Sequence, residues 1–75
     1  MDITEQATLD FEEEAYFTAF GMKKFGGSFV KSLGEALSRA DGINRMSIKK
    51  AFPEYWEKYL KIGEKKLFKG DEINE

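Results

Sequence analysis

The segment IKKAFPEYWEKYL, residues 48–60, decides how this chain folds. Its apolar and aromatic side chains recur at the three- and four-residue spacing of one helix face, yet the only proline of the chain lies among them. The members of this stripe are Ile48, Phe52, Tyr55, Trp56, Tyr59 and Leu60. A surface this aromatic has to be buried, either in the core of the chain itself or against a partner.

Pro53 predicts that the stripe is divided between two helices. Proline lacks a backbone N–H, and its ring collides with the carbonyl four residues earlier, which belongs to Lys49. Proline also disfavours helical dihedral angles at the preceding residue, Phe52, whereas it is favoured at the first position of a helix. We therefore expect one helix to end near residue 51 and another to begin at Pro53. A single, sharply kinked helix is the alternative.

Two more helices are predicted ahead of this segment. Asp10 and Glu13 have the spacing of a capping box, and an apolar face follows them. The turn at residues 26–28 predicts a left-handed glycine after the first helix and Ser28 as the N-cap of the second. Gly34 lies within that second helix and costs about 1 kcal/mol relative to alanine, which indicates either close approach by another helix or simple tolerance. Asn44, after the turn 41–44, is the expected N-cap of the third helix.

The sequence thus predicts one all-α domain over residues 1–75, a compact bundle of three to four short helices. The expected helices span about residues 10–25, 28–40, 45–51 and 53–69. Residues 1–9 and 71–75 are expected to fray, unless 1–9 extends the first helix. The predicted core consists of Phe11, Ala15, Ala19, Phe20, Phe29, Val30, Leu33, Leu37, Ile48, Phe52, Trp56 and Leu60.

The aromatic residues Tyr55, Trp56 and Tyr59 form the candidate partner interface. A chain of 75 residues buries only roughly 60–65% of the surface that its unfolded form exposes and has little else to build a core from, so most of the stripe is expected in the core. Any ring left exposed would be a hot spot for a protein partner. Self-association as a homodimer is a common way for such a small domain to gain buried area.

Charge is distributed unevenly along the chain. Residues 1–20 contain six acidic and no basic residues, whereas residues 21–51 contain seven basic and two acidic residues. An acidic first third can therefore lie against a basic middle third, within one chain or between two. The basic residues are also the candidate contacts of an alternative function, nucleic-acid binding: Lys23, Lys24, Lys31, Arg39, Arg45, Lys49 and Lys50. The net charge of −2 and a pI of about 5.2 disfavour that alternative.

No pattern in the sequence predicts an enzyme, a metal site or a cofactor. The chain has no cysteine, so it has no thiolate metal ligand, and no histidine, which removes the commonest general base and the commonest neutral metal ligand. Residues 21–28 have the glycine spacing of a phosphate-binding loop, but Gly27 occupies the place of its essential lysine. The turn 41–44 has too few oxygen ligands for calcium. The consecutive glutamates 12–14 point about 100° apart on a helix and do not converge.

Residues 29–41 together with Asn44 and the segment 48–56 resemble small uncharacterised proteins encoded by bacteriophages and mobile elements. The resemblance covers roughly residues 29–59 and implies a short accessory protein, with no catalytic residues to transfer. The chain has no apolar run long enough to span a membrane, and its first residues, MDITEQ, are unlike a signal peptide. We therefore expect a cytoplasmic, non-catalytic protein-interaction module, such as a phage adaptor or inhibitor of host machinery.

Overall fold

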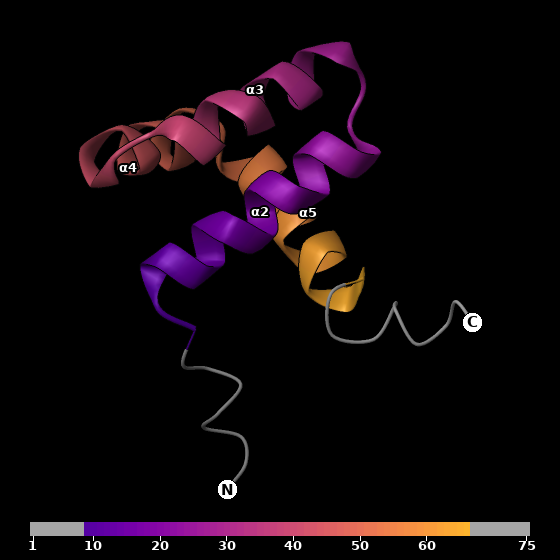
Figure 1. Cartoon of the computed structure of the whole chain (residues 1–75), viewed down its shortest axis with the longest axis horizontal. Coiled ribbons are helices and arrows are strands. Elements are labelled where there is room, and N and C mark those ends of the chain that lie inside the picture. The colour runs from indigo at the N-terminus through magenta and orange to yellow at the C-terminus, as the bar shows by residue number, and fades with distance from the viewer. Residues whose placement is uncertain (1–8, 67–75) are drawn as a thin grey trace, which may run out of the picture.

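A computed structural model describes residues 9–66 of the chain, and this part is built from four helices and no strand (Figure 1). The helices are α2 (Phe11–Phe25), α3 (Ser28–Arg39), α4 (Gly42–Ala51) and α5 (Pro53–Lys65). The predicted all-α fold is therefore confirmed. The expectations for residues 1–8 and 67–75, including the last turn of the fourth helix, lie outside the described residues.

The first helix begins with the predicted capping box. The Asp10 carboxylate accepts a hydrogen bond from the Glu13 N–H at 2.8 Å, and the Glu13 side chain accepts one from the Asp10 N–H at 3.1 Å. Two N–H groups that the helix itself cannot satisfy are thus paired. Acidic residues fill the first turn and two lysines the last turn, which matches the helix dipole at both ends.

The turn between α2 and α3 differs from the prediction. Gly26 is extended, with φ −83° and ψ 163°, and no described residue has a positive φ. The N-cap of α3 is Gly27, and Ser28 is the first helical residue. Glycine is needed at position 26 for space, because a Cβ there would lie 2.5 Å from Cγ1 of Val30.

The third helix begins three residues earlier than predicted, and the chain then breaks at the predicted place. Asp41, and not Asn44, is the N-cap of α4, because its carboxylate accepts from the Asn44 N–H at 2.9 Å. Phe52, with φ −131° and ψ 61°, leaves the helical region between α4 and α5. Pro53 occupies the first turn of α5, so the prediction of two helices is confirmed.

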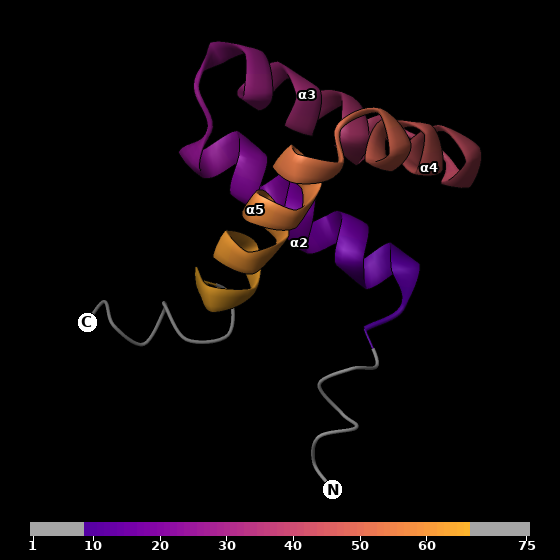
Figure 2. The ribbon, with the colours of Figure 1, turned by 180° about the vertical axis from the view of Figure 1, so that it is seen from behind.

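Helix α2 is the one against which the rest of the chain packs. Both α3 and α5 contact α2 along much of their length, and α4 makes far fewer contacts with α3 and α5. Figures 1 and 2 show α5 crossing α2, with α3 and α4 together in the upper part of both views. Residues near the two ends of the described chain thus meet at the α2–α5 crossing.

Glycines permit the closest contacts between these helices. A Cβ at Gly21 would lie 3.2 Å from the carbonyl carbon of Tyr59, and one at Gly63 would lie 2.8 Å from the carbonyl carbon of Phe17. A Cβ at Gly34 would lie 2.7 Å from Cβ of Met22, so of the two explanations left open by the sequence, close approach by another helix and simple tolerance, the structure shows the close approach. The crossing of α2 and α5 therefore brings backbone against backbone, a contact that the sequence analysis did not anticipate.

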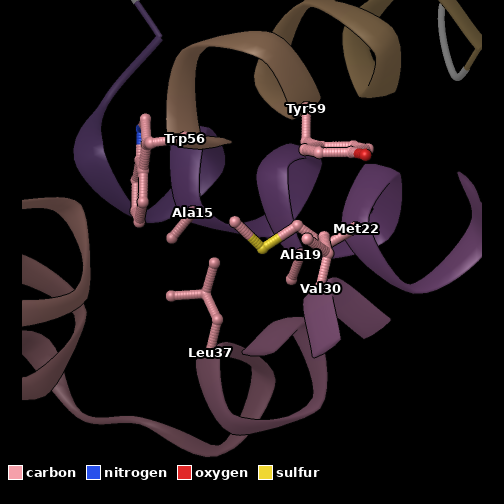
Figure 3. Packing of buried hydrophobic residues seen from close by; sticks show 7 residues of the cluster. All are labelled: Ala15, Ala19, Met22, Val30, Leu37, Trp56 and Tyr59. Carbon is pink, nitrogen blue, oxygen red and sulfur yellow. The ribbon is translucent and has the colours of Figure 1, made fainter. Parts of the chain in front are cut away.

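The core lies between α2, α3 and α5. Figure 3 shows Trp56 and Tyr59 of α5 on one side, Val30 and Leu37 of α3 on the other, and Met22 of α2 between them. The buried apolar residues are Ala15, Ala19, Met22, Val30, Leu37, Trp56 and Tyr59. Five partly buried residues pack against them: Phe11, Leu33, Ile48, Leu60 and Ile62.

The predicted core is wrong in part: Phe20 and Phe52 are half-buried and lie outside the core cluster. Phe29 was expected inside, yet 56% of it is exposed. Met22 and Tyr59 were not in the predicted core, yet both are buried. The helix geometry explains Phe29: the buried face of α3 is centred on Val30, Gly34 and Leu37, and Phe29 projects about 100° away from Val30.

Candidate functional site

Three aromatic rings form a contiguous cluster at the surface. The ring of Phe29 lies 5.8 Å from that of Phe52 and 6.2 Å from that of Tyr55, and the rings of Phe52 and Tyr55 stack at 6.0 Å. Phe29 is 56% exposed, Tyr55 is 38% exposed and Phe52 is half-buried. We call these three residues the surface cluster.

The local structure explains why the surface cluster forms. Phe29 lies in the first turn of α3, Phe52 is the residue at the break before Pro53, and Tyr55 lies in the first turn of α5. Phe52 and Tyr55 are consecutive members of the stripe, one at the break and the other in the turn that follows it, and their rings stack. The buried ring of Tyr59 lies 6.4 Å from that of Tyr55 and connects the cluster to the core.

A shallow groove of about 450 Å³ runs between α3 and α4 beside the surface cluster. Its lining residues are Ala36, Arg39, Ala40, Asn44, Ser47, Ile48, Ala51 and Phe52. Phe52 belongs to both the groove and the surface cluster, so the two form one continuous surface. The groove is lined mainly by apolar side chains, together with the polar side chains of Arg39, Asn44 and Ser47.

Of the candidate partner residues predicted from the sequence, only Tyr55 presents its ring to solvent. Trp56 is 2% exposed and Tyr59 is 7% exposed, because both point from α5 into the core (Figure 3). The aromatic patch expected at Tyr55, Trp56 and Tyr59 is therefore reduced to Tyr55. Its neighbours at the surface are Phe29 and Phe52, which the sequence had placed in the core.

Trp56 is held by a polar and aromatic environment below the surface. Its ring stacks on that of Phe11 at 5.7 Å with 10° between the planes, and its indole N–H donates to Glu14 Oε1 at 3.2 Å. The ammonium of Lys49 donates to the same oxygen at 2.9 Å and lies 5.5 Å from the Trp56 ring. One carboxylate thus satisfies both the indole and a cation from α4.

The predicted contact of the acidic first third with the basic middle third occurs within one chain. Lys49 pairs with Glu14, and Arg45 lies 3.8 Å from Glu12. Glu13 instead completes the capping box. The three consecutive glutamates therefore point to three different partners, as their helical spacing predicts.

The structure gives the basic candidates for nucleic-acid contact different surroundings. Arg45 and Lys49 face Glu12 and Glu14, and Arg39 lies 4.0 Å from Glu35 in the next turn. Lys24, Lys31 and Lys50 are exposed, and Lys23 is half-buried beside Gly34. Three of the seven cations thus have a carboxylate beside them, which lowers the positive charge offered to a phosphate backbone.

A hollow of about 390 Å³ opens between α2 and α3. Its residues are Glu12, Ala15, Tyr16, Ala19, Phe20, Lys23, Leu37, Ser38 and Arg45. The small side chains of Ala15 and Ala19 leave room at its floor, and Tyr16 stands at its edge with 62% of its surface exposed. It shares no lining residue with the surface cluster or with the groove.

Within residues 9–66, no group of three or more acidic side chains is placed to hold a metal ion. None of the helices in this part of the chain combines the length and the apolar character needed to cross a membrane. No protein-family model, curated protein or solved structure matches the chain. The candidate site therefore rests on the geometry of the chain itself.

Proposed function

We propose that this chain is a non-catalytic protein-interaction module that docks its partner on the surface cluster and the adjoining groove. The observation that carries this proposal is the mutual contact of three rings, Phe29, Phe52 and Tyr55, at the surface, where Phe29 is 56% exposed and Tyr55 is 38% exposed. The proposal keeps Tyr55 from the interface expected from the sequence. It replaces Trp56 and Tyr59, which are buried, with Phe29 and Phe52.

The geometry of the rings supports a binding role. Aromatic side chains dominate the energetics of many protein interfaces, because they bury a large area at a small cost in conformational entropy. Each ring of the surface cluster contacts the other two, and Tyr55 also contacts the buried Tyr59. The rings are thus held in place before binding, which lowers the entropy lost when a partner docks.

The groove indicates what the partner presents. Its floor of Ala36, Ala40 and Ile48 accepts an apolar side chain, and Arg39 beside it accepts a carboxylate or a carbonyl oxygen. A helix with apolar residues on one face and an acidic residue at its edge meets both requirements. We therefore propose an amphipathic helix of a partner protein as the ligand of this surface.

The setting that we propose is the cytoplasm of a bacterial cell, with the chain acting as an adaptor or inhibitor of host machinery. The resemblance to small bacteriophage proteins supports this role. The absence of histidine and cysteine from the sequence supports a function without catalysis.

Photo-crosslinking tests the proposal directly. Tyr55 is replaced by p-benzoylphenylalanine, and the chain is expressed in a bacterial host and irradiated. We expect a discrete crosslinked protein from position 55, and we expect it to disappear when Phe29→Ser is introduced into the same chain. The same photoreactive residue at Ile43, which is 79% exposed on α4, is the matched control.

The outcomes separate the alternatives. A protein captured from position 55 and not from position 43 supports the proposed surface. Equal capture from both positions, or capture that Phe29→Ser leaves unchanged, contradicts it. Circular dichroism of each variant shows whether the helices are intact, so loss of folding is distinguished from loss of binding.

A further inference from the structure

Within residues 9–66, the face of α2 that borders the hollow is left open to solvent at Tyr16. Glu12, Tyr16, Phe20 and Lys23 all line the hollow and recur at helical spacing, so they share one face of α2. Tyr16 is 62% exposed, although an aromatic ring gains most when it is buried. We call these four residues the α2 face.

The α2 face is complementary to itself. It carries an acid at its N-terminal end, a base at its C-terminal end and two aromatic rings between them. If two copies of α2 pack antiparallel, Glu12 of one copy lies opposite Lys23 of the other, and Tyr16 lies opposite Phe20. Both pairings share nearly the same midpoint along the helix, so one two-fold axis generates all of them.

We propose that the α2 face is a homodimer interface in which α2 packs antiparallel against α2 of a second copy. The ring of Tyr16 enters the hollow of the other copy, where Ala15, Ala19 and Leu37 form the apolar floor. Two Glu12–Lys23 pairs at the ends of the interface fix its register. This proposal goes beyond the partner surface proposed above, with which it shares no residue.

The contacts within the chain leave Glu12 available for such a pair. The Glu12 side chain is 81% exposed, and it approaches Arg45 only to 3.8 Å. An ion pair at that distance and exposure contributes little, so its loss on dimerisation costs little. Among residues 9–66, no carboxylate forms an ion pair with Lys23. The aliphatic part of its side chain lies against Gly34 of α3, which orients the side chain.

The expected dimer is weak and salt-sensitive. One helix face and its hollow bury less than a standard interface, so we expect a dissociation constant on the order of 10–100 µM. Because the Glu12–Lys23 pairs lie at the exposed ends of the interface, raising the salt concentration weakens the association.

Sedimentation equilibrium of the full chain over a concentration series tests the interface. We expect Tyr16→Ser to raise the dissociation constant at least about tenfold, since the main aromatic anchor is removed. Glu12→Lys and Lys23→Glu each place like charges opposite one another in a homodimer, so each variant alone is expected to be monomeric. An equimolar mixture of these two variants is expected to form heterodimers, because both end pairs are then of opposite charge.

Two further variants are matched controls. Lys31→Gln removes an exposed cation of α3 that lines neither the hollow nor the groove and leaves the α2 face intact, so the dissociation constant is expected to stay unchanged. Phe29→Ser alters the surface cluster only and is expected to behave in the same way. Circular dichroism establishes that every variant is folded.

The proposal is overturned if the unaltered chain is monomeric throughout the series. It is also overturned if a dimer forms that Tyr16→Ser leaves intact, or if mixing Glu12→Lys with Lys23→Glu produces no heterodimer. A dimer lost on Phe29→Ser and retained in Tyr16→Ser assigns self-association to the surface cluster instead. The crosslinking result at Tyr55 is independent of these outcomes, so failure of one proposal is distinguishable from failure of the other.

Discussion

The α2–α5 crossing and helix α4 hold their places in the fold by different means. At the crossing, Gly21 and Gly63 bring two backbones together, and Trp56 and Tyr59 are buried beside them. Helix α4 has no fully buried residue, and its attachment depends on the partly buried Ile48 and on the pairing of Lys49 with Glu14. The contacts that stabilise the fold are therefore concentrated in α2, α3 and α5, whereas α4 mainly forms part of the exposed surface.

This division agrees with the place of the candidate site. The groove is formed by α4 where it lies beside α3, and the surface cluster lies at the break where α4 ends. Elements with few buried contacts are those that open and adapt most readily. Substitutions at Trp56, Gly63, Glu14 and Ile43 measure this contrast in stability.

Trp56→Ala is expected to lower the free energy of unfolding by about 3–5 kcal/mol, the range for a large aromatic side chain removed from a core. Trp56 is 2% exposed and stacks on Phe11, so its loss leaves a cavity between α2, α4 and α5. Urea denaturation followed by circular dichroism measures the change. An unchanged denaturation midpoint and slope would show that Trp56 is not part of the core.

Gly63→Ala is expected to cost roughly 3 kcal/mol, since the added methyl collides with the backbone of Phe17 and pushes α5 away from α2. Alanine normally stabilises a helix interior by about 1 kcal/mol relative to glycine, so the sign itself is diagnostic. Gly42→Ala is the matched control, because a Cβ there meets no atom within 4 Å. Thermal denaturation of both variants decides whether the backbone contact at the crossing is real.

Glu14→Ala is expected to cost about 1 kcal/mol more than Glu12→Ala. The Glu14 carboxylate accepts from both Lys49 and Trp56 and is 23% exposed, whereas that of Glu12 is 81% exposed and lies 3.8 Å from Arg45. Both positions lie in the first turn of α2, so helix propensity and the dipole contribute similarly to each. Equal costs in urea denaturation would mean that Glu14 does not anchor α4.

Ile43→Ser is expected to change the free energy of unfolding by no more than about 0.5 kcal/mol. Ile43 is 79% exposed on α4 and belongs to neither the core nor the groove. Denaturation with urea provides the measurement. A loss of 2 kcal/mol or more would exceed what surface substitutions cost and would show that α4 is packed more closely than its exposure indicates.

The helices were predictable because their local signals agree with the tertiary structure. Asp10 and Glu13 form the expected capping box, and Pro53 begins a helix as its chemistry requires. The start of α4 was missed because Asp41 and Asn44 are both good N-cap residues and Gly42 indicates a turn. The choice is made by the Asp41 carboxylate, which reaches the Asn44 N–H.

The site was less predictable, because it depends on how helices are oriented relative to one another. Hydrophobic periodicity places Phe29 and Trp56 on apolar helix faces. It does not rank their exposure, because each apolar face is wider than the area that the neighbouring helix covers. The close contact of α2 and α5 at Gly21 and Gly63 decides this exposure. It places α5 near enough to α2 to bury Trp56 and Tyr59, whereas Tyr55 stays exposed. A glycine within a helix indicates either close approach or tolerance, and at Gly21, Gly34 and Gly63 the neighbouring helix lies too close for a Cβ.

Trp56 is an intrinsic fluorescence probe of the place where α2, α4 and α5 meet. Trp56 is the only tryptophan, so its emission comes from one place in the fold. Its indole touches Phe11 of α2 and shares a carboxylate with Lys49 of α4, at the junction of three helices. Detachment of α4 alone would alter the emission while the helical circular dichroism persists. Fluorescence and circular dichroism recorded together therefore distinguish local opening from global unfolding without any added label.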